Sequence, residues 1–237
     1  ALGAQVDVVA CDVADRTALD ELLSAIAPEH PLTGVVHAAG VLADGLLADL
    51  TPQRLATVLR PKVDAAWHLH EATKDLDLSM FVLFSSAAAT FGNAGQGNYA
   101  AANAVLDGLA RYRWARGLPA VSLGWGLWEE TSTMTAGMTD TDRARMARAG
   151  MRRLSTEDAL VLFDQALAAP LPHALPLPVP KPEAGTEVPA LLRELVRVPT
   201  QRPVARTATA DQGGLADRLA ALTPVEQRNH VLSMVIT

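Results

Sequence analysis

The sequence is short of the features that mark several large classes of protein. Its single cysteine, Cys11, cannot form a disulfide within the chain, so a reducing, cytoplasmic setting is expected. No uninterrupted apolar run approaches the roughly 18–20 residues that a membrane-spanning helix needs. The first residues, ALGAQVDVVACDV, lack the basic stretch followed by an apolar stretch that marks a signal peptide. We therefore expect neither a membrane protein nor a secreted one.

Positive charge is also scarce, with 20 Lys and Arg against 26 Asp and Glu and a net charge of −6. No basic block occurs, so nucleic acid is not an expected partner. His37, His68 and His70 do not have the spacing of a metal site, and we expect no metal and structural roles for these histidines. Hydrophobic residues, in contrast, are plentiful. They make up 49% of the sequence, which is enough for a sizeable core.

Short apolar runs alternate with amphipathic segments through residues 1–180. The predicted strands lie at 5–10, 34–37, 80–84, 120–123 and 174–179, and the prolines of the last place it at an edge. The predicted helices lie at 15–26, 51–73, 99–116 and 155–168, and Pro61 should break or kink the second. Strands alternating with helices of this length indicate an α/β fold with a doubly wound, parallel, Rossmann-like sheet.

Ligands of such sheets bind beyond the carboxyl ends of the strands. The residues that follow each predicted strand are therefore candidates for binding and catalysis. They are Asp12, the turn Ala38-Ala39-Gly40, the pair Ser85-Ser86, and the Gly-Trp-Gly at 124–126.

Four polar residues form a candidate catalytic group. Ser86 follows a strand, Tyr99 begins the next helix, and Asn103 lies four residues later on the same helix face. A phenol with a reference pKa near ~10 can act as a general acid if a nearby cation stabilises its anion. Lys62 is the candidate cation, because it lies on an otherwise apolar helix stripe. Taken one at a time, Tyr99 could be a core residue, Lys62 a surface lysine, and Ser85 could replace Ser86.

Several motifs agree with one family in order and spacing: HAAGVLADGLLADL, LRPKVDAAWHLHE, FVLFSSAA, GQGNYAAANAVLDGLA and SLGWGLW. Over residues 4–180 the chain resembles the ketoreductase domains of modular type I polyketide synthases, which are short-chain dehydrogenases/reductases. The resemblance implies NADPH-dependent reduction of a carrier-bound β-ketoacyl thioester to a β-hydroxyacyl thioester. Tyr99 would protonate the β-carbonyl oxygen and Ser86 would hydrogen-bond it. Lys62 would lower the Tyr99 pKa and hold the cofactor ribose, and Asn103 would support the lysine and a proton-relay water.

The same resemblance implies further site residues. Those expected along the cofactor are Asp12, Val13, Ala38, Ala39 and Gly40, together with Lys62 and Tyr99. Those expected at the substrate are Leu42, Asp44, Phe91, Gln96, Trp125 and Met134. Asp12 could instead cap a turn, and Asp44 could be an ordinary loop residue. Leu42-Ala43-Asp44 resembles the Leu-Asp-Asp loop that goes with a D (R) alcohol, and Ala101 is not the proline of the epimerising subtype.

The glycine-rich phosphate loop and the first two strands of the family fold do not occur in the sequence. NADPH is thus implied by the resemblance alone. We expect a piece of a longer chain that, by itself, binds NADPH poorly and is inactive.

Residues 181–214, rich in Pro, Thr, Ala and Gly, predict a linker, and 215–237 resemble the start of an acyl carrier domain. The implied partners are a carrier domain with its phosphopantetheine-bound substrate and other polyketide synthase domains. Two alternatives stay open at this point: a reductively inactive docking segment of a megasynthase, and a redox-silent epimerase.

Overall fold

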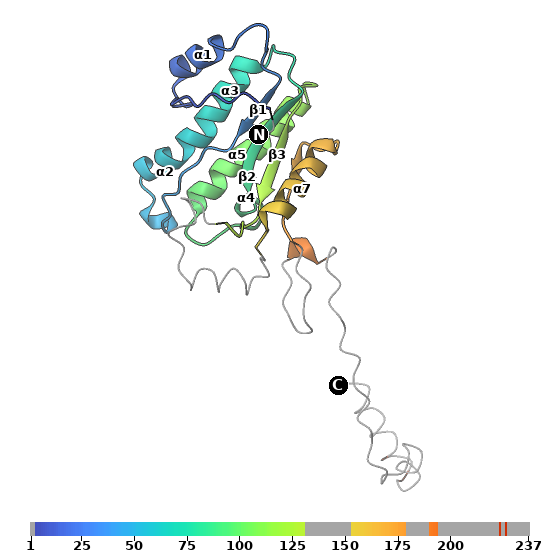
Figure 1. Ribbon diagram of the computed structural model, residues 1–237. Helices are drawn as coiled ribbons and strands as arrows, with labels where there is room; N and C mark the ends of the chain where they lie inside the picture. The colour runs from blue at the N-terminus through green and yellow to red at the C-terminus, as the bar shows by residue number, and fades with distance from the viewer. Residues whose placement is uncertain (1–2, 131–152, 179–189, 194–222, 224–225, 227–237) are drawn as a thin grey trace. The chain divides into compact units, whose positions relative to one another are not determined.

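Figure 1 shows the computed structural model, which describes residues 3–130, 153–178, 190–193, 223 and 226. The chain divides into two compact units, Ala1–Lys181 and Pro182–Thr237. The fold and the site described below belong to the first unit.

The first unit is built on a sheet of four parallel strands in the order β1-β2-β3-β4. The strands are β1 (Gly34–His37), β2 (Met80–Ser86), β3 (Val121–Trp125) and β4 (His173–Ala174). Because neighbouring strands are also consecutive in sequence and run the same way, each connection must cross over the sheet through a helix. The prediction of an α/β fold with a parallel sheet is confirmed.

The helical segments begin where the sequence provides caps. Asp15, Thr51 and Ser155 each accept hydrogen bonds from the first backbone N–H groups of α1, α2 and α7. The segments of the first unit are α1 (Arg16–Ser24), η1 (Leu47–Asp49), α2 (Pro52–Leu59), η2 (Arg60–Asp64), α3 (Ala65–Thr73), α4 (Ala88–Phe91), α5 (Gly97–Trp114) and α7 (Thr156–Ala168). A short 3-10 turn, η3 (Ala190–Leu192), is described in the second unit.

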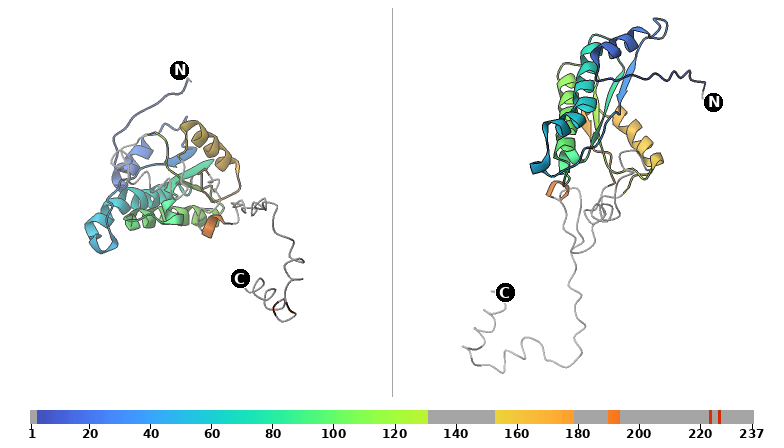
Figure 2. Two further views of the ribbon diagram at one scale, coloured as in Figure 1. Left: turned by 90° about the horizontal axis from the view of Figure 1, so that it is seen from below. Right: turned by 90° about the vertical axis from the view of Figure 1, so that its left-hand side faces the viewer.

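Helices cover the sheet on both faces, with α3 and α5 on one side and α7 on the other (Figure 2). The central strand β2 serves both layers, because successive side chains of a strand point to opposite faces. Phe81 and Leu83 pack with Leu69 and Leu106 in the core under α3 and α5. Val82 packs in the second core, under α7.

The predicted strand at 5–10 is wrong. These residues form no strand, and Val6, Val8 and Val9 are 77%, 95% and 59% exposed. A strand needs a neighbour to take its backbone hydrogen bonds, and no described strand lies beyond β1 in the sheet. The last predicted strand, 174–179, is reduced to β4, in agreement with the proline-rich sequence that follows it.

Of the break or kink expected at Pro61, the break does not occur. The chain stays helical from α2 to α3 by widening to the π-helix η2, in which the Ala65 N–H donates to the Arg60 carbonyl. Proline cannot supply the N–H of a regular α-turn, and a π-turn is one way to absorb that loss. As a result Lys62 points into the interior and is 3% exposed.

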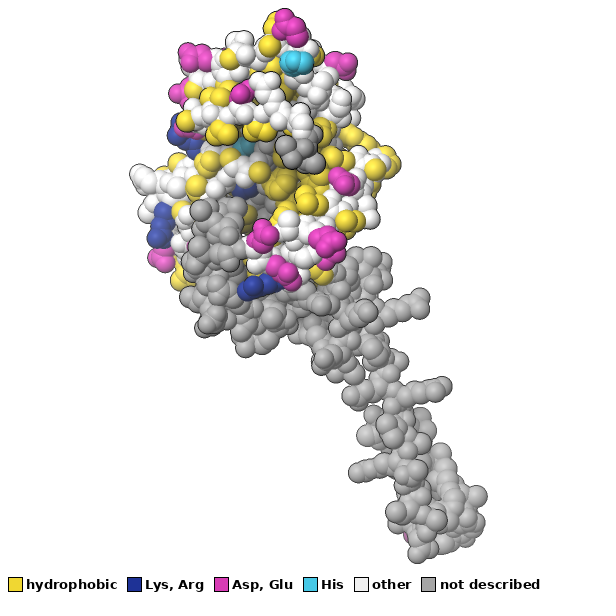
Figure 3. Space-filling view, in the orientation of Figure 1, with side chains coloured by type: hydrophobic (Ala, Val, Ile, Leu, Met, Phe, Trp, Pro, Cys, Tyr) yellow, Lys and Arg dark blue, Asp and Glu magenta, His cyan; other side chains and the backbone are white. Residues whose placement is uncertain are grey.

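Apolar side chains also reach the surface of the first unit. Leu160 and Val161 on α7 are 57% and 52% exposed, and Figure 3 shows hydrophobic side chains gathered near that side of the face shown. None of the described helices has the length and apolar composition that crossing a membrane requires.

Candidate active site

The candidate site lies where β1, β2 and β3 end. Ser86, the last residue of β2, is in register with Trp125, the last residue of β3. His37 ends β1 and is followed by the small-residue turn of Ala38, Ala39 and Gly40. This is the edge of a parallel sheet at which ligands bind in doubly wound folds.

Tyr99 lies in the first turn of α5, and Asn103 lies one turn further along the same helix face. The Asn103 side-chain amide donates to the Tyr99 carbonyl at 2.8 Å. Asn103 is fully buried, and its Oδ1 has no hydrogen-bond partner among the described residues. A buried acceptor without a partner is costly, so this atom is suited to a bound water or ligand group.

Lys62 reaches the same place from the π-helix. Its Nζ donates to the carbonyl of Phe84 at 2.9 Å and lies 5.6 Å from the centre of the Tyr99 ring. Burial lowers the pKa of Lys62 to about 8, while the negative charge of Asp107 acts in the opposite direction. The ammonium therefore stays mostly protonated at neutral pH, next to the phenol.

The pKa of Tyr99 is raised, chiefly because burial disfavours the phenolate. Hydrogen bonding to the Ser86 hydroxyl and the Asn103 side chain lowers this pKa, and the charge of Asp44 raises it further. The expectation that Lys62 makes the phenol more acidic than usual is thus not met in this structure, because burial outweighs the groups that favour the anion. The proton stays on Tyr99 in the resting site.

The two neighbouring serines have different environments. Ser85 is buried and donates to the carbonyl of Asn103 at 3.2 Å, so its hydroxyl holds β2 to α5. Ser86 is only half-buried, accepts from the N–H of Ala88 at 3.2 Å and interacts with the Tyr99 phenol. Of the two serines, Ser86 is therefore the one whose hydroxyl interacts with Tyr99.

Two loops from distant parts of the sequence meet beside Tyr99. The Gln96 side chain donates to the Asp44 carboxylate at 2.9 Å, and the Asn98 side chain donates to the Ala43 carbonyl at 2.9 Å. A backbone hydrogen bond from Gly45 to Gly95, 2.8 Å long, adds to this contact. The structure thus joins two of the predicted substrate residues, Asp44 and Gln96, and Leu42 lies partly buried in the same loop.

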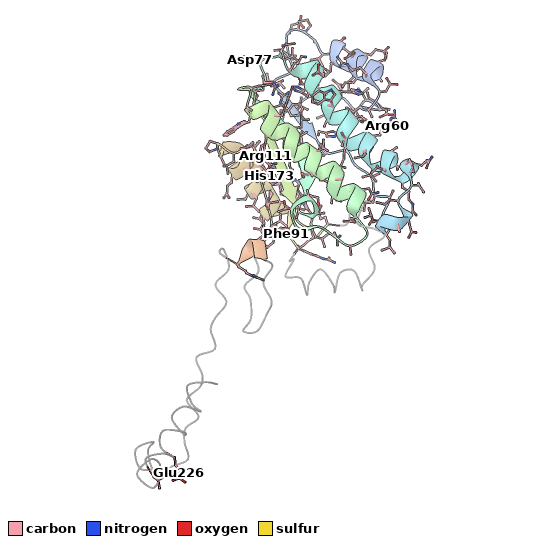
Figure 4. The ribbon with its side chains drawn as sticks, turned by 180° about the vertical axis from the view of Figure 1, so that it is seen from behind. Arg60, Asp77, Phe91, Arg111, His173 and Glu226 are labelled. Carbon is pink, nitrogen blue, oxygen red and sulfur yellow. The ribbon has the colours of Figure 1, made fainter. Side chains whose placement is uncertain are left out.

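The other predicted substrate residues are more scattered. Trp125 is 6% exposed and packs against Phe84 and Trp128 at 5.4 and 5.0 Å between ring centroids, in the core under α7. Phe91 ends α4, where Figure 4 labels it, and is partly buried. Met134 lies outside the described residues.

Of the predicted cofactor residues, Ala38, Ala39 and Gly40 directly follow β1, and Asp12 and Val13 lie just before α1. Asp12 accepts from Ala14 N–H at 3.0 Å and pairs with Arg60 at 2.8 Å, so it closes a turn, the alternative weighed from the sequence. Val13 packs against the core under α3 and α5. A Cβ on Gly40 would lie 2.8 Å from Lys62 Cε, so only a residue without a side chain allows this close approach. A rim of small residues beside a lysine, a phenol and an unpartnered amide oxygen fits a nicotinamide cofactor.

The sequence analysis missed a buried carboxylate behind the site. Asp107 is 5% exposed and accepts from Ser122 at 2.6 Å, and His173 lies 3.5 Å from the same oxygen. Arg111 lies 3.4 Å from the His173 ring, and Figure 4 shows these two side chains coming from α5 and β4. The available signal was spacing: Asp107 is four residues after Asn103 and so shares its helix face.

Comparisons with known proteins place the chain in one family. The model of the KR domain family matches residues 1–130. The chain is 55% identical over 239 residues to the spectinabilin polyketide synthase system protein NorA' of Streptomyces orinoci, and the match covers 99% of this chain and 6% of that protein. It is 50% identical over 242 residues to Pks1 of Mycobacterium tuberculosis, a phenolphthiocerol synthesis polyketide synthase whose name marks it as inactive, covering 98% of this chain and 15% of that protein.

A solved structure described as an A-type ketoreductase from a modular polyketide synthase has a TM-score of 0.70 and 45% sequence identity, covering 75% of this chain and 37% of that one. The chain therefore spans a small part of the curated relatives it matches and about a third of that solved chain. The family model, the relatives and the parallel α/β fold all lead to the same assignment: the chain belongs to the KR domain family, the ketoreductases of polyketide synthases.

Proposed function

We propose that this segment carries the catalytic residues for reducing a β-ketoacyl thioester to a β-hydroxyacyl thioester in polyketide biosynthesis, with NADPH as the reductant. One observation carries the proposal. Lys62, Ser86 and Asn103 gather around Tyr99: the Lys62 ammonium lies 5.6 Å from the centre of its ring, the Asn103 amide donates to its carbonyl, and the Ser86 hydroxyl interacts with its phenol.

The chemistry proposed for the site is a proton transfer matched to a hydride transfer. A nicotinamide cofactor, when bound, would supply the hydride for the β-carbon, so the role of the protein groups is to stabilise the negative charge that would develop on the β-oxygen. Ser86 hydrogen-bonds that oxygen, and the Tyr99 hydroxyl gives it a proton. The phenolate that remains is stabilised by the Lys62 ammonium and by hydrogen bonds from Ser86 and Asn103.

Protein groups in the described residues suit the cofactor. The turn Ala38-Ala39-Gly40 lets backbone approach a ligand closely, and Lys62 and Tyr99 present donors that could hold ribose hydroxyls. Asp12 and Val13 are proposed to lie near the adenine, although the Asp12 carboxylate is already paired with Arg60.

The product proposed is the D (R) alcohol, without epimerisation of the α-carbon. Its support is the loop of Leu42, Ala43 and Asp44, which is fixed beside Tyr99 by the hydrogen bond from Gln96 to Asp44. Chiral analysis of the reduced thioester tests this, and an S alcohol would contradict it.

The substrate is proposed to arrive on the phosphopantetheine arm of an acyl carrier domain. The proposed domain organisation is a catalytic segment at 1–180, a linker at 181–214 and the start of a carrier domain at 215–237. The relatives support this in outline, because the matched proteins are large polyketide synthases.

The test uses a hybrid in which this chain replaces the aligned part of the solved A-type ketoreductase. Tyr99→Phe removes the proton donor and should lower NADPH oxidation with a β-ketoacyl thioester by about a hundredfold or more. Tyr112→Phe is the matched control, because Tyr112 is the other tyrosine of the chain and lies 37% exposed on the outer side of α5. It should keep full activity.

The second candidate function is that of a reductively inactive segment. The reason to consider it is that the name of one relative describes that protein as inactive. A folded hybrid without NADPH oxidation would support that candidate and overturn the proposal. The presence of all four expected catalytic residues in one site favours the reductase.

A further inference from the structure

Three hydrogen bonds hold the loop at residues 43–45 against the start of α5, a segment far from it in sequence. They run from the Gln96 side chain to the Asp44 carboxylate at 2.9 Å, from the Gly45 N–H to the Gly95 carbonyl at 2.8 Å, and from the Asn98 side chain to the Ala43 carbonyl at 2.9 Å. The place of this loop relative to Tyr99 therefore depends on how strong each of the three contacts is.

The contact made by Asn98 differs from the other two in its burial. Asp44 is exposed, so water can replace the hydrogen bond that its carboxylate accepts. The bond between Gly45 and Gly95 joins two glycines, which have the most backbone freedom and fix little by themselves. Asn98 is 1% exposed, and a buried amide that loses its partner is left unsatisfied at a larger cost. The loop therefore depends most on Asn98.

The other half of the same amide acts on the helix. Asn98 Oδ1 accepts from the backbone N–H of Tyr99 at 2.9 Å. N–H groups in the first turn of a helix have no partner within the helix, and the N-cap residue of α5, Gln96, makes no capping hydrogen bond with its side chain. Asn98 supplies the acceptor that the N-cap does not. One buried side chain thus connects the backbone of the loop to the backbone of Tyr99.

This connection places polar groups beside the phenol. The Gln96 side-chain oxygen accepts from Asn93 at 2.8 Å, so its NH2 group is turned towards the Asp44 carboxylate. Asp44 lies near enough to Tyr99 for its negative charge to raise the pKa of the phenol, after the larger effect of burial. A substrate held at Tyr99 would therefore meet this loop on one side.

We propose that Asn98 is a positioning residue for specificity, which fixes the loop at 43–45 relative to Tyr99 and so limits the β-ketoacyl group to one orientation at the phenol. Because it is buried under the loop, Asn98 itself touches neither substrate nor cofactor. Its effect on the product rests on the proposed function, whereas its effect on the loop does not.

Two variants of Asn98 isolate the bond to the loop. Asn98→Leu has a similar size and loses both hydrogen bonds. Asn98→Asp keeps the shape and the oxygen that accepts from Tyr99, but it loses the donor to Ala43. A carboxylate in the first turn of a helix is favourable, so this variant should fold. Only the aspartate brings a charge and only the leucine loses the acceptor, so an effect common to both comes from the lost donor.

The first measurement is amide hydrogen exchange of the 237-residue chain, followed by NMR. In both variants the Gly45 amide should exchange about tenfold faster or more, relative to amides at the centre of β2, because the loop opens locally. The Tyr99 amide should lose protection in Asn98→Leu and keep it in Asn98→Asp.

The control is Thr73→Val. It removes a buried hydrogen bond of 2.6 Å, from the Thr73 hydroxyl to the Leu69 carbonyl, inside α3. The protein should lose stability as it does in the Asn98 variants, but the exchange of Gly45 relative to β2 should stay unchanged.

The second measurement is the ratio of the two alcohols formed by the hybrid ketoreductase, determined by chiral chromatography. Both Asn98 variants should lower the ratio of the major to the minor alcohol by about tenfold or more, because a loosened loop admits a second orientation of the substrate. The fall in kcat should be smaller, since Tyr99, Ser86 and Lys62 are retained. Thr73→Val should keep the ratio of the unchanged hybrid.

Three results would overturn the proposal. They are an unchanged exchange rate of Gly45 in both folded variants, an unchanged alcohol ratio in an active hybrid, and equal effects in Thr73→Val, which would trace both changes to lost stability. If Asn98→Leu fails to fold, Asn98→Asp provides both measurements. An unchanged hybrid without activity would count against the proposed function, while the exchange of Gly45 would still decide whether Asn98 holds the loop.

Discussion

Lys62 shows how one buried charge organises the site. A lysine that is 3% exposed loses most of its hydration, and its hydrogen bond to the Phe84 carbonyl replaces only part of it. The negative charge of Asp107 offsets some of the remaining cost. This cost is consistent with a functional group and hard to explain in a residue that serves stability alone.

Gly40→Ala should move this ammonium without unfolding the protein. The new Cβ would lie 2.8 Å from Lys62 Cε and 3.4 Å from Nζ, and the end of a lysine side chain can shift at little cost. We expect kcat of the hybrid ketoreductase to fall by about tenfold or more, with little change in the free energy of unfolding. Steady-state kinetics and chemical denaturation measure the two quantities.

Gly108→Ala is the matched control for that variant. Gly108 lies inside α5 with no atom within 4 Å of an added Cβ. Alanine there should leave kcat unchanged and stabilise the protein by about 0.5–1 kcal/mol. Full activity in Gly40→Ala would show that the lysine does not need its present position.

His37 also makes the stability depend on pH. Its pKa is about 4 in the folded protein against 6.5 for an ordinary histidine, so the unfolded chain binds the proton more readily. This contribution to stability is complete above pH 6.5 and is lost as the pH falls towards 4. The loss amounts to about 3 kcal/mol at most. Urea denaturation of the unchanged chain and of His37→Gln should differ in pH dependence by this amount, whereas a change at the exposed His30 should have no such effect.

Individual residues of the site were predictable to very different degrees. Ser86, Tyr99 and Asn103 could be placed together because each stands at a fixed point of a strand or helix that the apolar pattern predicts. The burial of His37 and the effect of the Asp107 charge on Lys62 could not be predicted, because they depend on contacts between segments far apart in sequence. The catalytic roles of Ser86, Tyr99 and Asn103 remain predictions.

At the scale of elements, the caps were the most predictable feature and the π-helix the least. Asp15, Thr51 and Ser155 cap α1, α2 and α7 because short polar side chains satisfy the free N–H groups of a helix start. Pro61 signals an interruption but not its form, since a kink, a break and a π-turn all accommodate the missing N–H. The π-helix η2 packs against α5, and a contact between segments so far apart in sequence is not visible in the local pattern.

The link between α5 and β3 allows a test at this scale. Asp107→Asn and Ser122→Ala both disturb the 2.6 Å hydrogen bond, and each should destabilise the protein by about 1–3 kcal/mol. Only Asp107→Asn removes the charge that raises the pKa of Lys62. The titration midpoint of the Lys62 ammonium, followed by NMR of 13C-labelled lysine, should therefore fall below 8 in Asp107→Asn and stay near 8 in Ser122→Ala. Equal midpoints in both variants would show that Asp107 does not act on Lys62 through its charge.

At the scale of the whole molecule, the alternation of apolar runs with amphipathic segments was enough to predict a parallel sheet covered on both faces. This alternation did not predict which apolar runs become strands of the sheet. The segment with Val6 and Val8 has the composition of a strand but no partner among the described strands, and Val36 on β1 is 47% exposed. Strand formation depends on a neighbour in space, which a local pattern cannot supply.

The first compact unit of the chain ends at Lys181. Both described core clusters draw all their members from residues before that point, between Val13 and Ala174. Ending the chain at Lys181 therefore removes no residue from either core and should change the Tm of the first unit by less than about 2 °C. Differential scanning calorimetry of the full and shortened chains makes the comparison. A fall of more than about 4 °C, equivalent to at least roughly 1 kcal/mol, would mean that residues beyond 181 help to hold the catalytic unit together.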